Sequence, residues 1–173
     1  MPLNYHNYDA LSFDCYGTLI DWESGIWSAF QPLIDANSDL QVDQQQVLAE
    51  FAEFENQIQS DHPDMSYPDV LSSVHNRFAL THGLVTTGVR DATFGESVGQ
   101  WPAFPDSAEA LAHLKKRYKL VILSNVHDAG FVASNEHLDV EFDAIYTAEQ
   151  IGTYKPDIGN FEFLFTHLLA EQG

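Results

Sequence analysis

The chain has 173 residues, of which 45% are apolar and 13% aromatic, so it can bury a hydrophobic core and wholesale disorder is disfavoured. Twenty-six acidic residues oppose seven basic ones, and the net charge of −19 disfavours nucleic acid and anionic membranes as partners. No apolar run is long enough to span a bilayer, and MPLNYHNYDA lacks a secretion signal. We therefore expect a cytoplasmic protein, and such acidity would suit a high-salt cytoplasm.

Three short apolar runs predict the strands of a parallel α/β sheet. They cover residues 10–14, 120–123 and 144–146, and polar residues follow each of them. In sheets of this kind ligands bind at the carboxyl ends of the strands. We therefore expect Asp14, Ser124 and Asn125 to face one crevice, although more than a hundred residues separate Asp14 from the other two.

Between the first two strands the pattern of apolar residues is helical. Apolar side chains recur at intervals of three and four along residues 26–34, 47–58 and 70–78. Asp43 and Ser66 stand just ahead of the second and third of these segments and are suited to cap them. Three helices are therefore predicted in this part of the chain.

These helices define the expected organisation of the whole chain. Residues 23–98 are predicted to be a helical insertion, and residues 1–22 and 99–173 are predicted to form the core. After the insertion, the spacing Asp106-x-x-Glu109 predicts a capping box at the start of another helix. A last helix is expected from about residue 158 to residue 169.

Asp14 is the strongest candidate for a catalytic residue. It ends a predicted strand and is followed by the glycine-bearing turn Tyr16-Gly17-Thr18, which would hold the carboxylate in one place. The N–H groups of that turn would keep the carboxylate ionised and direct one oxygen outwards, as a nucleophile requires. The alternative is an ordinary aspartate at a strand end.

Lys155 and the pair Ser124-Asn125 are the next candidates. Lys155 is one of seven bases and lies in a loop where Pro156 prevents helix continuation. A lysine beside a carboxylate keeps that carboxylate deprotonated, whereas a solvated surface lysine is the alternative. Ser124 and Asn125 offer a hydroxyl and an amide for a polar or anionic substrate group, and loop capping is their alternative role.

Taken together, three segments of the sequence resemble the haloacid dehalogenase superfamily. FDCYGTL at residues 13–19, LSN at 123–125 and YKPD at 154–157 correspond, in that order, to the first three of its four signature motifs. The helical insertion after the first motif matches the mobile cap of the family. The resemblance covers nearly the whole chain and implies a Rossmann-like parallel sheet with an inserted helical cap.

Tyr16 distinguishes between subgroups of this superfamily. Its phosphatases carry a second aspartate at this position, which acts as a general acid and helps to hold Mg²⁺. An aromatic residue removes both functions. The sequence therefore resembles the metal-independent 2-haloacid dehalogenases. This resemblance implies that Asp14 attacks the halogen-bearing carbon of a small 2-haloalkanoic acid and that water then cleaves the aspartyl ester.

The same resemblance assigns roles to the remaining candidates. Thr18 would orient Asp14, and Lys155 would balance its charge. The residues expected to contact the substrate are Tyr16, Ser124 and Asn125. No metal or cofactor is expected, and a small molecule is the expected binding partner. A Mg²⁺-dependent phosphatase is the alternative within the superfamily, and activity that requires Mg²⁺ would favour it.

The cap departs from the family pattern in its charge. The dehalogenases use a cap arginine near the active site, but residues 44–51 contain none. Arg77 and Arg90 are the only bases of the insertion, fall later, and are more simply explained as surface residues. An acidic cap without such a base disfavours a carboxylate substrate.

The end of the sequence is the second departure. The family continues through two further strands and a fourth motif, whereas this sequence ends 18 residues after Lys155. The C-terminal strands of the core are therefore expected to be missing, and strand 10–14 would become a sheet edge with unpaired backbone groups. Self-association that covers this edge is expected. The third hypothesis is a truncated, non-catalytic protein that persists by such association.

Overall fold

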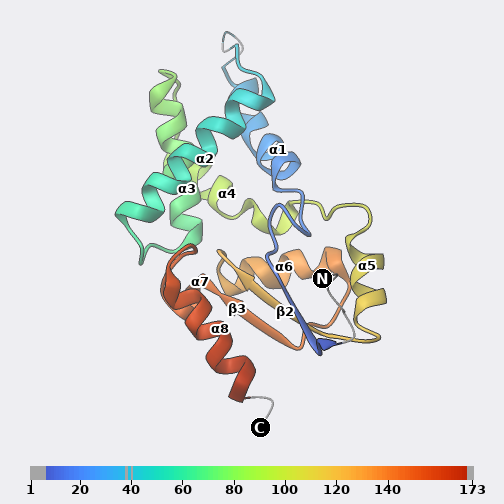
Figure 1. Cartoon of the computed structure of the whole chain (residues 1–173). Coiled ribbons are helices and arrows are strands. Elements are labelled where there is room, and N and C mark those ends of the chain that lie inside the picture. Colours follow the sequence, from blue (N-terminus) through green and yellow to red (C-terminus); the bar gives the residue numbers. More distant parts are fainter. Residues whose placement is uncertain (1–6, 38, 40, 171–173) are drawn as a thin grey trace.

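A parallel three-stranded sheet forms the core of the computed structural model, which describes residues 7–37, 39 and 41–170. The strands β1 (Ala10–Phe13), β2 (Lys119–Ser124) and β3 (Ala144–Thr147) lie in the order β1-β2-β3 (Figure 1). The register pairs Ser12 with Val121. All three predicted strands and the α/β fold class are confirmed, although β1 stops at Phe13, so that Asp14 lies just beyond its carboxyl end.

The side chains of β2 alternate between the two faces of the sheet, because successive residues of a strand point in opposite directions. Leu120 and Ile122 belong to the large buried cluster that includes Leu111 of α5 (Ser107–Leu114) and Phe131 of α6 (Asp128–Leu138). The intervening residues Val121 and Leu123 form a second cluster with β3 and with Leu164 of α8 (Ile158–Ala170). Helices therefore cover both faces, and all of β2 except Lys119 is buried.

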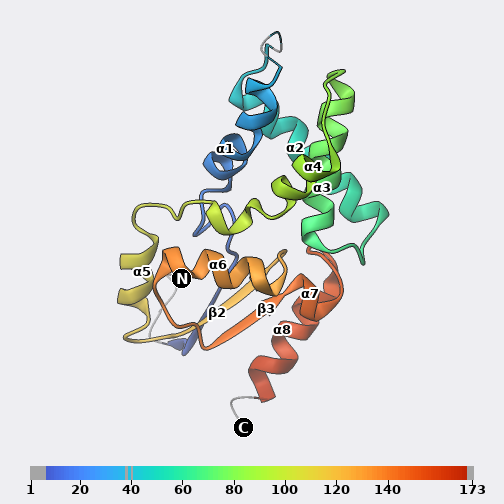
Figure 2. The same ribbon diagram turned by 180° about the vertical axis from the view of Figure 1, so that it is seen from behind.

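The helices that follow β1, up to residue 100, form a separate layer at the carboxyl end of the sheet (Figures 1 and 2). They are α1 (Trp22–Asp35), α2 (Gln44–Asp61), α3 (Tyr67–Thr81) and α4 (Gly88–Gly95), followed by the 3₁₀ helix η2 (Ser97–Gln100). The predicted insertion 23–98 begins one residue inside α1 and ends within η2. Residues 1–6 and 171–173 of the predicted core lie outside the described residues. None of the described helices has the length and apolar composition that crossing a membrane requires.

The core of this helical cap includes most of the apolar residues that the sequence pattern predicted, together with Phe94 of α4, which that pattern did not predict. Phe30, Phe51 and Phe78, from three different helices, are almost completely buried. Asp43 caps α2, because its Oδ1 accepts a hydrogen bond of 2.8 Å from the Gln46 N–H. Ser66 caps α3 in the same way. Both predicted caps are confirmed.

The predicted capping box at Asp106 is wrong. Asp106 does precede α5, but its side chain makes no capping hydrogen bond. The backbone of Asp106 has φ −101° and ψ −8°, whereas the extended backbone of a capping residue is what turns its side chain onto the first helical N–H groups. The sequence pattern gave no prediction for the segments of α6 and α7 (Ala148–Ile151). The short helix α4 lies inside the predicted helical insertion, although no individual helix was predicted at its residues.

Candidate active site

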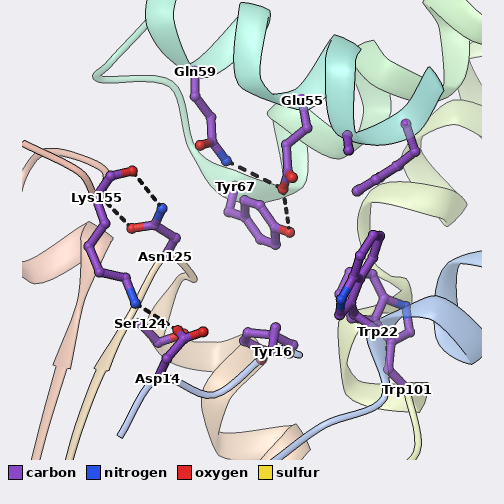
Figure 3. Close-up of a pocket in the computed structure, with 12 residues that line it drawn as sticks. Asp14, Tyr16, Trp22, Glu55, Gln59, Tyr67, Trp101, Ser124, Asn125 and Lys155 are labelled. Atoms are coloured by element: carbon purple, nitrogen blue, oxygen red, sulfur yellow. Dashed lines mark hydrogen bonds and ion pairs between the residues drawn. The ribbon is translucent and has the colours of Figure 1, made fainter. Parts of the chain in front are cut away.

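A cavity of about 250 Å³ lies between the carboxyl ends of β1 and β2 and the cap helix α2 (Figure 3). The core contributes five of the six predicted site residues to its lining, namely Asp14, Tyr16, Ser124, Asn125 and Lys155. The other side is lined by Trp22, Phe51, Ala52, Glu55, Gln59, Tyr67 and Trp101. Segments far apart in the sequence thus meet at one crevice, as expected from the strand ends.

Asp14 and Lys155 form an ion pair at the floor of the cavity (Figure 3). The Lys155 Nζ donates a hydrogen bond of 2.6 Å to Asp14 Oδ1 and another of 2.7 Å to the carbonyl oxygen of Leu123. The Asp14 side chain is 45% exposed, so its carboxylate remains accessible from the cavity. Burial raises the pKa of the neighbouring Cys15 thiol to about 12, so the carboxylate is the better nucleophile at neutral pH.

Asn125 is committed to the loop that carries Lys155. Its Oδ1 accepts a hydrogen bond of 2.6 Å from the Lys155 N–H, and its Nδ2 donates one of 3.0 Å to the Lys155 carbonyl oxygen. This pair of bonds fixes the backbone of Lys155 beside the end of β2. Asn125 was expected to bind substrate, and that role stays a prediction. In the structure its amide group holds the Lys155 backbone in place.

Ser124, at the end of β2, has a hydroxyl group without a hydrogen-bond partner among the described residues. Its side chain lines the cavity, yet its Oγ is buried and has no hydrogen-bond partner within the described part of the chain. A buried hydroxyl without a partner costs free energy, which a bound ligand would recover by forming that bond. The Ser124 hydroxyl is therefore suited to bind a polar substrate atom.

The turn after Asp14 does not support the carboxylate in the expected way. Gly17 has φ +89°, a conformation that glycine adopts without strain, and its N–H donates to the Ile20 carbonyl oxygen at 2.8 Å. The N–H groups of Thr18 and Leu19 both donate to the Cys15 carbonyl oxygen. The N–H groups of Gly17 and Thr18 therefore do not hold Asp14 as expected, because backbone acceptors already occupy them.

Thr18 lies outside the cavity lining. Its side chain is exposed, and its hydroxyl makes no hydrogen bond to Asp14 or to any other group that the structure describes. The structure thus does not bring Thr18 into contact with the carboxylate that it was expected to orient. In this arrangement Lys155 is the side chain that orients Asp14.

Tyr16 forms an apolar wall beside Asp14. Its ring packs edge-on against Trp101, with ring centroids 5.5 Å apart. Its hydroxyl is hydrogen-bonded to Ser134 at 2.9 Å, and burial raises its pKa, so it stays neutral at any physiological pH. This side chain therefore supplies shape and an uncharged surface next to the reacting carboxylate.

Sequence reasoning missed the polar groups that the cap brings to the site. Glu55 and Gln59 of α2 lie in the cavity lining, and Tyr67 of α3 donates a hydrogen bond of 2.8 Å to Glu55 Oε1 (Figure 3). A signal was present in the sequence, since Glu55 lies four residues after Phe51 and directly follows Phe54 on an otherwise apolar face. The sequence does not indicate that Glu55 points towards Asp14, because this depends on how α2 is placed above the sheet.

The lining does not suit the Mg²⁺ ion of the phosphatase alternative. A magnesium site in a protein of this kind is built from clustered carboxylate oxygens. Asp14 and Glu55 are the only carboxylates of the lining and come from opposite sides of the cavity, and Asp14 is paired with Lys155. No group of three residues suited to hold a metal ion occurs in the described ranges. Metal-independence itself stays a prediction.

The fold is shared with solved dehalogenase structures. It matches the L-2-haloacid dehalogenase PA0810 with TM-score 0.77 and 21% identity, covering 93% of this chain and 71% of that one. The defluorinating L-2-haloacid dehalogenase Rha0230 matches with TM-score 0.79 and 19% identity, covering 93% and 69%. The Xanthobacter autotrophicus L-2-haloacid dehalogenase with chloropropionic acid covalently bound matches with TM-score 0.78 and 18% identity, covering 93% and 65%.

At these identities the likeness establishes a dehalogenase-type α/β fold with an inserted helical cap. The sequence itself establishes the family, because residues 8–171 match the haloacid dehalogenase-like hydrolases. The chain therefore belongs to the haloacid dehalogenase-like hydrolase family. No curated protein is significantly similar to the sequence.

Proposed function

We propose that the protein catalyses the hydrolytic dehalogenation of a small 2-haloalkanoic acid or a close derivative, with Asp14 as the covalent nucleophile. One observation carries this proposal: Asp14 is held by Lys155 at 2.6 Å on the floor of a cavity, with Tyr16 rather than a second carboxylate beside it. A charged nucleophile next to an apolar wall suits attack on a carbon–halogen bond. Chloropropionic acid bound covalently to the Xanthobacter autotrophicus enzyme supports the same route.

In the first step, the Asp14 carboxylate oxygen that does not bind Lys155 attacks the halogen-bearing carbon. A carbon–oxygen bond forms while the carbon–halogen bond breaks, and the halide leaves with the bonding electrons. Lys155 keeps the other oxygen fixed, so the attacking oxygen is presented in one orientation. The Ser124 hydroxyl is available to bind the carbonyl oxygen of the substrate.

In the second step, water adds to the carbonyl carbon of the Asp14 ester. The bond between that carbon and the ester oxygen breaks, which releases the 2-hydroxy product and restores the carboxylate. Overall, one organic halide and one water give one alcohol, one halide ion and one proton. The ammonium of Lys155 lies within hydrogen-bond distance of the aspartyl oxygen and stabilises negative charge that develops there.

The test is halide release from 2-chloropropionate and 2-bromopropionate in buffer containing a metal chelator. We expect release by the wild type, a loss of about a thousandfold or more in Asp14→Asn, and no change in Asp106→Asn. Asp106 is a matched control because it is exposed and its side chain makes no capping bond. In heavy-oxygen water, a single turnover should place the label first in Asp14.

Other outcomes decide between the alternatives. Activity on a phosphate ester that appears only with added Mg²⁺ would favour the phosphatase. A folded protein that releases no halide from either acid or from the corresponding amides, with or without Mg²⁺, would contradict the proposal and favour the non-catalytic hypothesis. Circular dichroism of each variant establishes that the protein tested is folded.

A further inference from the structure

Glu55 is the charged group that the cap directs at the candidate active site. It lies on α2 between Phe51 and Gln59, four residues from each, and all three line the cavity. Residues four apart share one face of a helix, so this stripe of α2 forms the roof above Asp14. Figure 3 shows the Glu55 carboxyl group pointing down into the cavity.

One side of this carboxyl group is already bound, and the other is open. Tyr67 donates a hydrogen bond of 2.8 Å to Oε1, and Gln59 donates a longer one of 3.4 Å to the same oxygen. Oε2 has no hydrogen-bond partner among the residues that the structure describes. The roof therefore presents an acceptor oxygen to whatever occupies the cavity.

The cations nearby are engaged elsewhere. Lys155 is bound to Asp14 and to the Leu123 carbonyl oxygen on the floor. Arg77 stacks over the Phe54 ring at 4.6 Å, and Arg90 lines a different cavity, between α1 and α4. The active-site lining thus has two carboxyl groups and one ammonium, which gives a net negative charge when Glu55 is ionised.

We propose that Glu55 determines the substrate class, so that at neutral pH the site prefers an uncharged 2-halo compound with an N–H or O–H donor, such as a 2-haloamide, over the free 2-haloalkanoate. This inference rests on the proposed function, because it places the same halogen-bearing carbon next to Asp14. The amide N–H donates to the open oxygen of Glu55. A free carboxylate in that place would face a like charge in a partly buried site.

The amide also satisfies the other polar groups of the cavity. Its carbonyl oxygen accepts from the buried Ser124 hydroxyl, which has no partner among the described residues. The carbon between the carbonyl and the halogen then lies between the floor and the roof, where Asp14 attacks it. Each polar atom of the amide has a partner of complementary type, whereas a carboxylate leaves its second oxygen opposite Glu55.

The preference for the amide over the free acid should also depend on the protonation state of Glu55. Burial raises its pKa from 4.5 to about 6, although the Tyr67 hydrogen bond opposes this shift. The groups that face it are Tyr67 and Gln59 of the cap, Tyr154 of the core, and Asp14 and Lys155 across the cavity. Below pH 6 the neutral carboxyl group no longer repels a carboxylate, so the free acid should be accepted better there.

The experiment measures kcat/KM for 2-chloropropionamide and for 2-chloropropionate with wild type, Glu55→Gln and Glu53→Gln. Glu53 is the matched control, since it lies on the same helix but is exposed. At pH 7.5 we expect Glu55→Gln to lower the amide-to-acid ratio about tenfold, mainly through faster use of the acid, because a like-charge contact is removed. Wild type should also use the acid better as pH falls through 6, and Glu55→Gln should lose this trend.

An unchanged ratio in Glu55→Gln, with both compounds still releasing halide, would overturn the inference and leave the proposed function standing. If no variant releases halide from either compound, the proposed function fails, and binding of propionamide and propionate, measured by saturation-transfer NMR, decides the inference. Tighter binding of propionamide that Glu55→Gln equalises would support it. Equal binding of both compounds by the wild type would overturn it.

Discussion

Lys155 connects two strand ends that lie far apart in the sequence. Its ammonium group binds the Asp14 carboxylate beyond β1 and the Leu123 carbonyl oxygen in β2, at 2.6 and 2.7 Å. Asn125 in turn fixes the backbone of Lys155 through two hydrogen bonds. A charge-assisted bond at a fixed distance is stronger and more directional than one between neutral groups. The position of the nucleophile therefore depends on a lysine from the opposite end of the chain.

Replacing Lys155 by methionine should abolish dehalogenation while leaving the protein folded. The variant keeps the length of the side chain but loses the charge that orients Asp14, so we expect kcat to fall about a hundredfold or more. Halide release under saturating substrate measures this loss. Lys116→Met is the control, because Lys116 is exposed and lies outside the cavity lining. Retention of more than a tenth of the activity would contradict the role given to Lys155.

Glu55 should make stability depend on pH. Its pKa is raised from 4.5 to about 6 in the folded protein, so the unfolded chain ionises first and stability falls as pH rises through this window. Above pH 6 the loss amounts to about 2 kcal/mol, at 1.4 kcal/mol per pKa unit. Glu55→Gln should remove it, so the variant should be more stable than wild type at pH 7.5 by up to about 2 kcal/mol.

Urea unfolding at pH 4.5 and at pH 7.5 measures this effect, with Glu53→Gln as the control. The difference between Glu55→Gln and wild type should be large at the higher pH and small at the lower one. An equal difference at both values would show that the substitution acts through packing and not through ionisation of the carboxyl group.

At the scale of the elements, Trp101 is the side chain around which the cap and the core meet. It is 2% exposed, lines the active-site cavity and also lines a second cavity of about 290 Å³ between α1 and α4. Its ring contacts Tyr16 of the core, and its Nε1–H donates to Ser97 at 3.1 Å. Gly25 of α1 allows this close approach, since a Cβ there would lie 2.3 Å from Trp101 Cγ.

Gly25→Ala should therefore destabilise the protein, although alanine favours a helix. The added methyl group must displace Trp101, and overpacking of this kind typically costs about 1–3 kcal/mol. Thermal unfolding followed by circular dichroism should show a lower Tm. Gly88→Ala is the matched control, because a Cβ at that position would point into open space and helix propensity then favours alanine. Equal Tm values for both variants would contradict the packing argument.

At the scale of the whole molecule, the net negative charge should control how stability depends on salt. Twenty-six acidic residues outnumber seven basic ones, so the excess carboxylates repel one another, and salt screens this repulsion. We expect the Tm to rise with added KCl at neutral pH. Near the pI of 4.4 the net charge vanishes and the gain should shrink. A protein equally stable in dilute buffer and in concentrated KCl would contradict the link between acidity and a high-salt host.

The sheet edge leads to a prediction about assembly. Within the described residues β1 pairs with β2 alone, so its other side presents backbone groups that a second chain can pair with (Figure 1). We expect light scattering to give a mass that is a multiple of 19.4 kDa. Ser12→Lys, at an exposed position of β1, should shift the protein towards the monomer, since charge on an edge strand opposes pairing. A wild type that is strictly monomeric would contradict self-association.

The binding partners of the protein and its cytoplasmic location stay predictions.

Much of this architecture is encoded in local patterns. The apolar spacing along α1, α2 and α3 predicted which side chains are buried, because a helix can bury only one face and that face recurs every three to four residues. The strand ends and the segments around Asp14, Ser124 and Lys155 likewise predicted one crevice and the family. These properties follow from the sequence because each depends on a few consecutive residues or on the general rule for parallel sheets.

Only the tertiary structure decided how the groups in that crevice face one another. Glu55 enters the site because α2 lies over the carboxyl ends of β1 and β2, and Thr18 stays outside because its turn closes on the Cys15 carbonyl oxygen. Asn125 binds the backbone of Lys155 because the fold places the loop that carries Lys155 beside the end of β2. Such contacts depend on the relative placement of whole elements, which the packing of the complete core determines and no local pattern records.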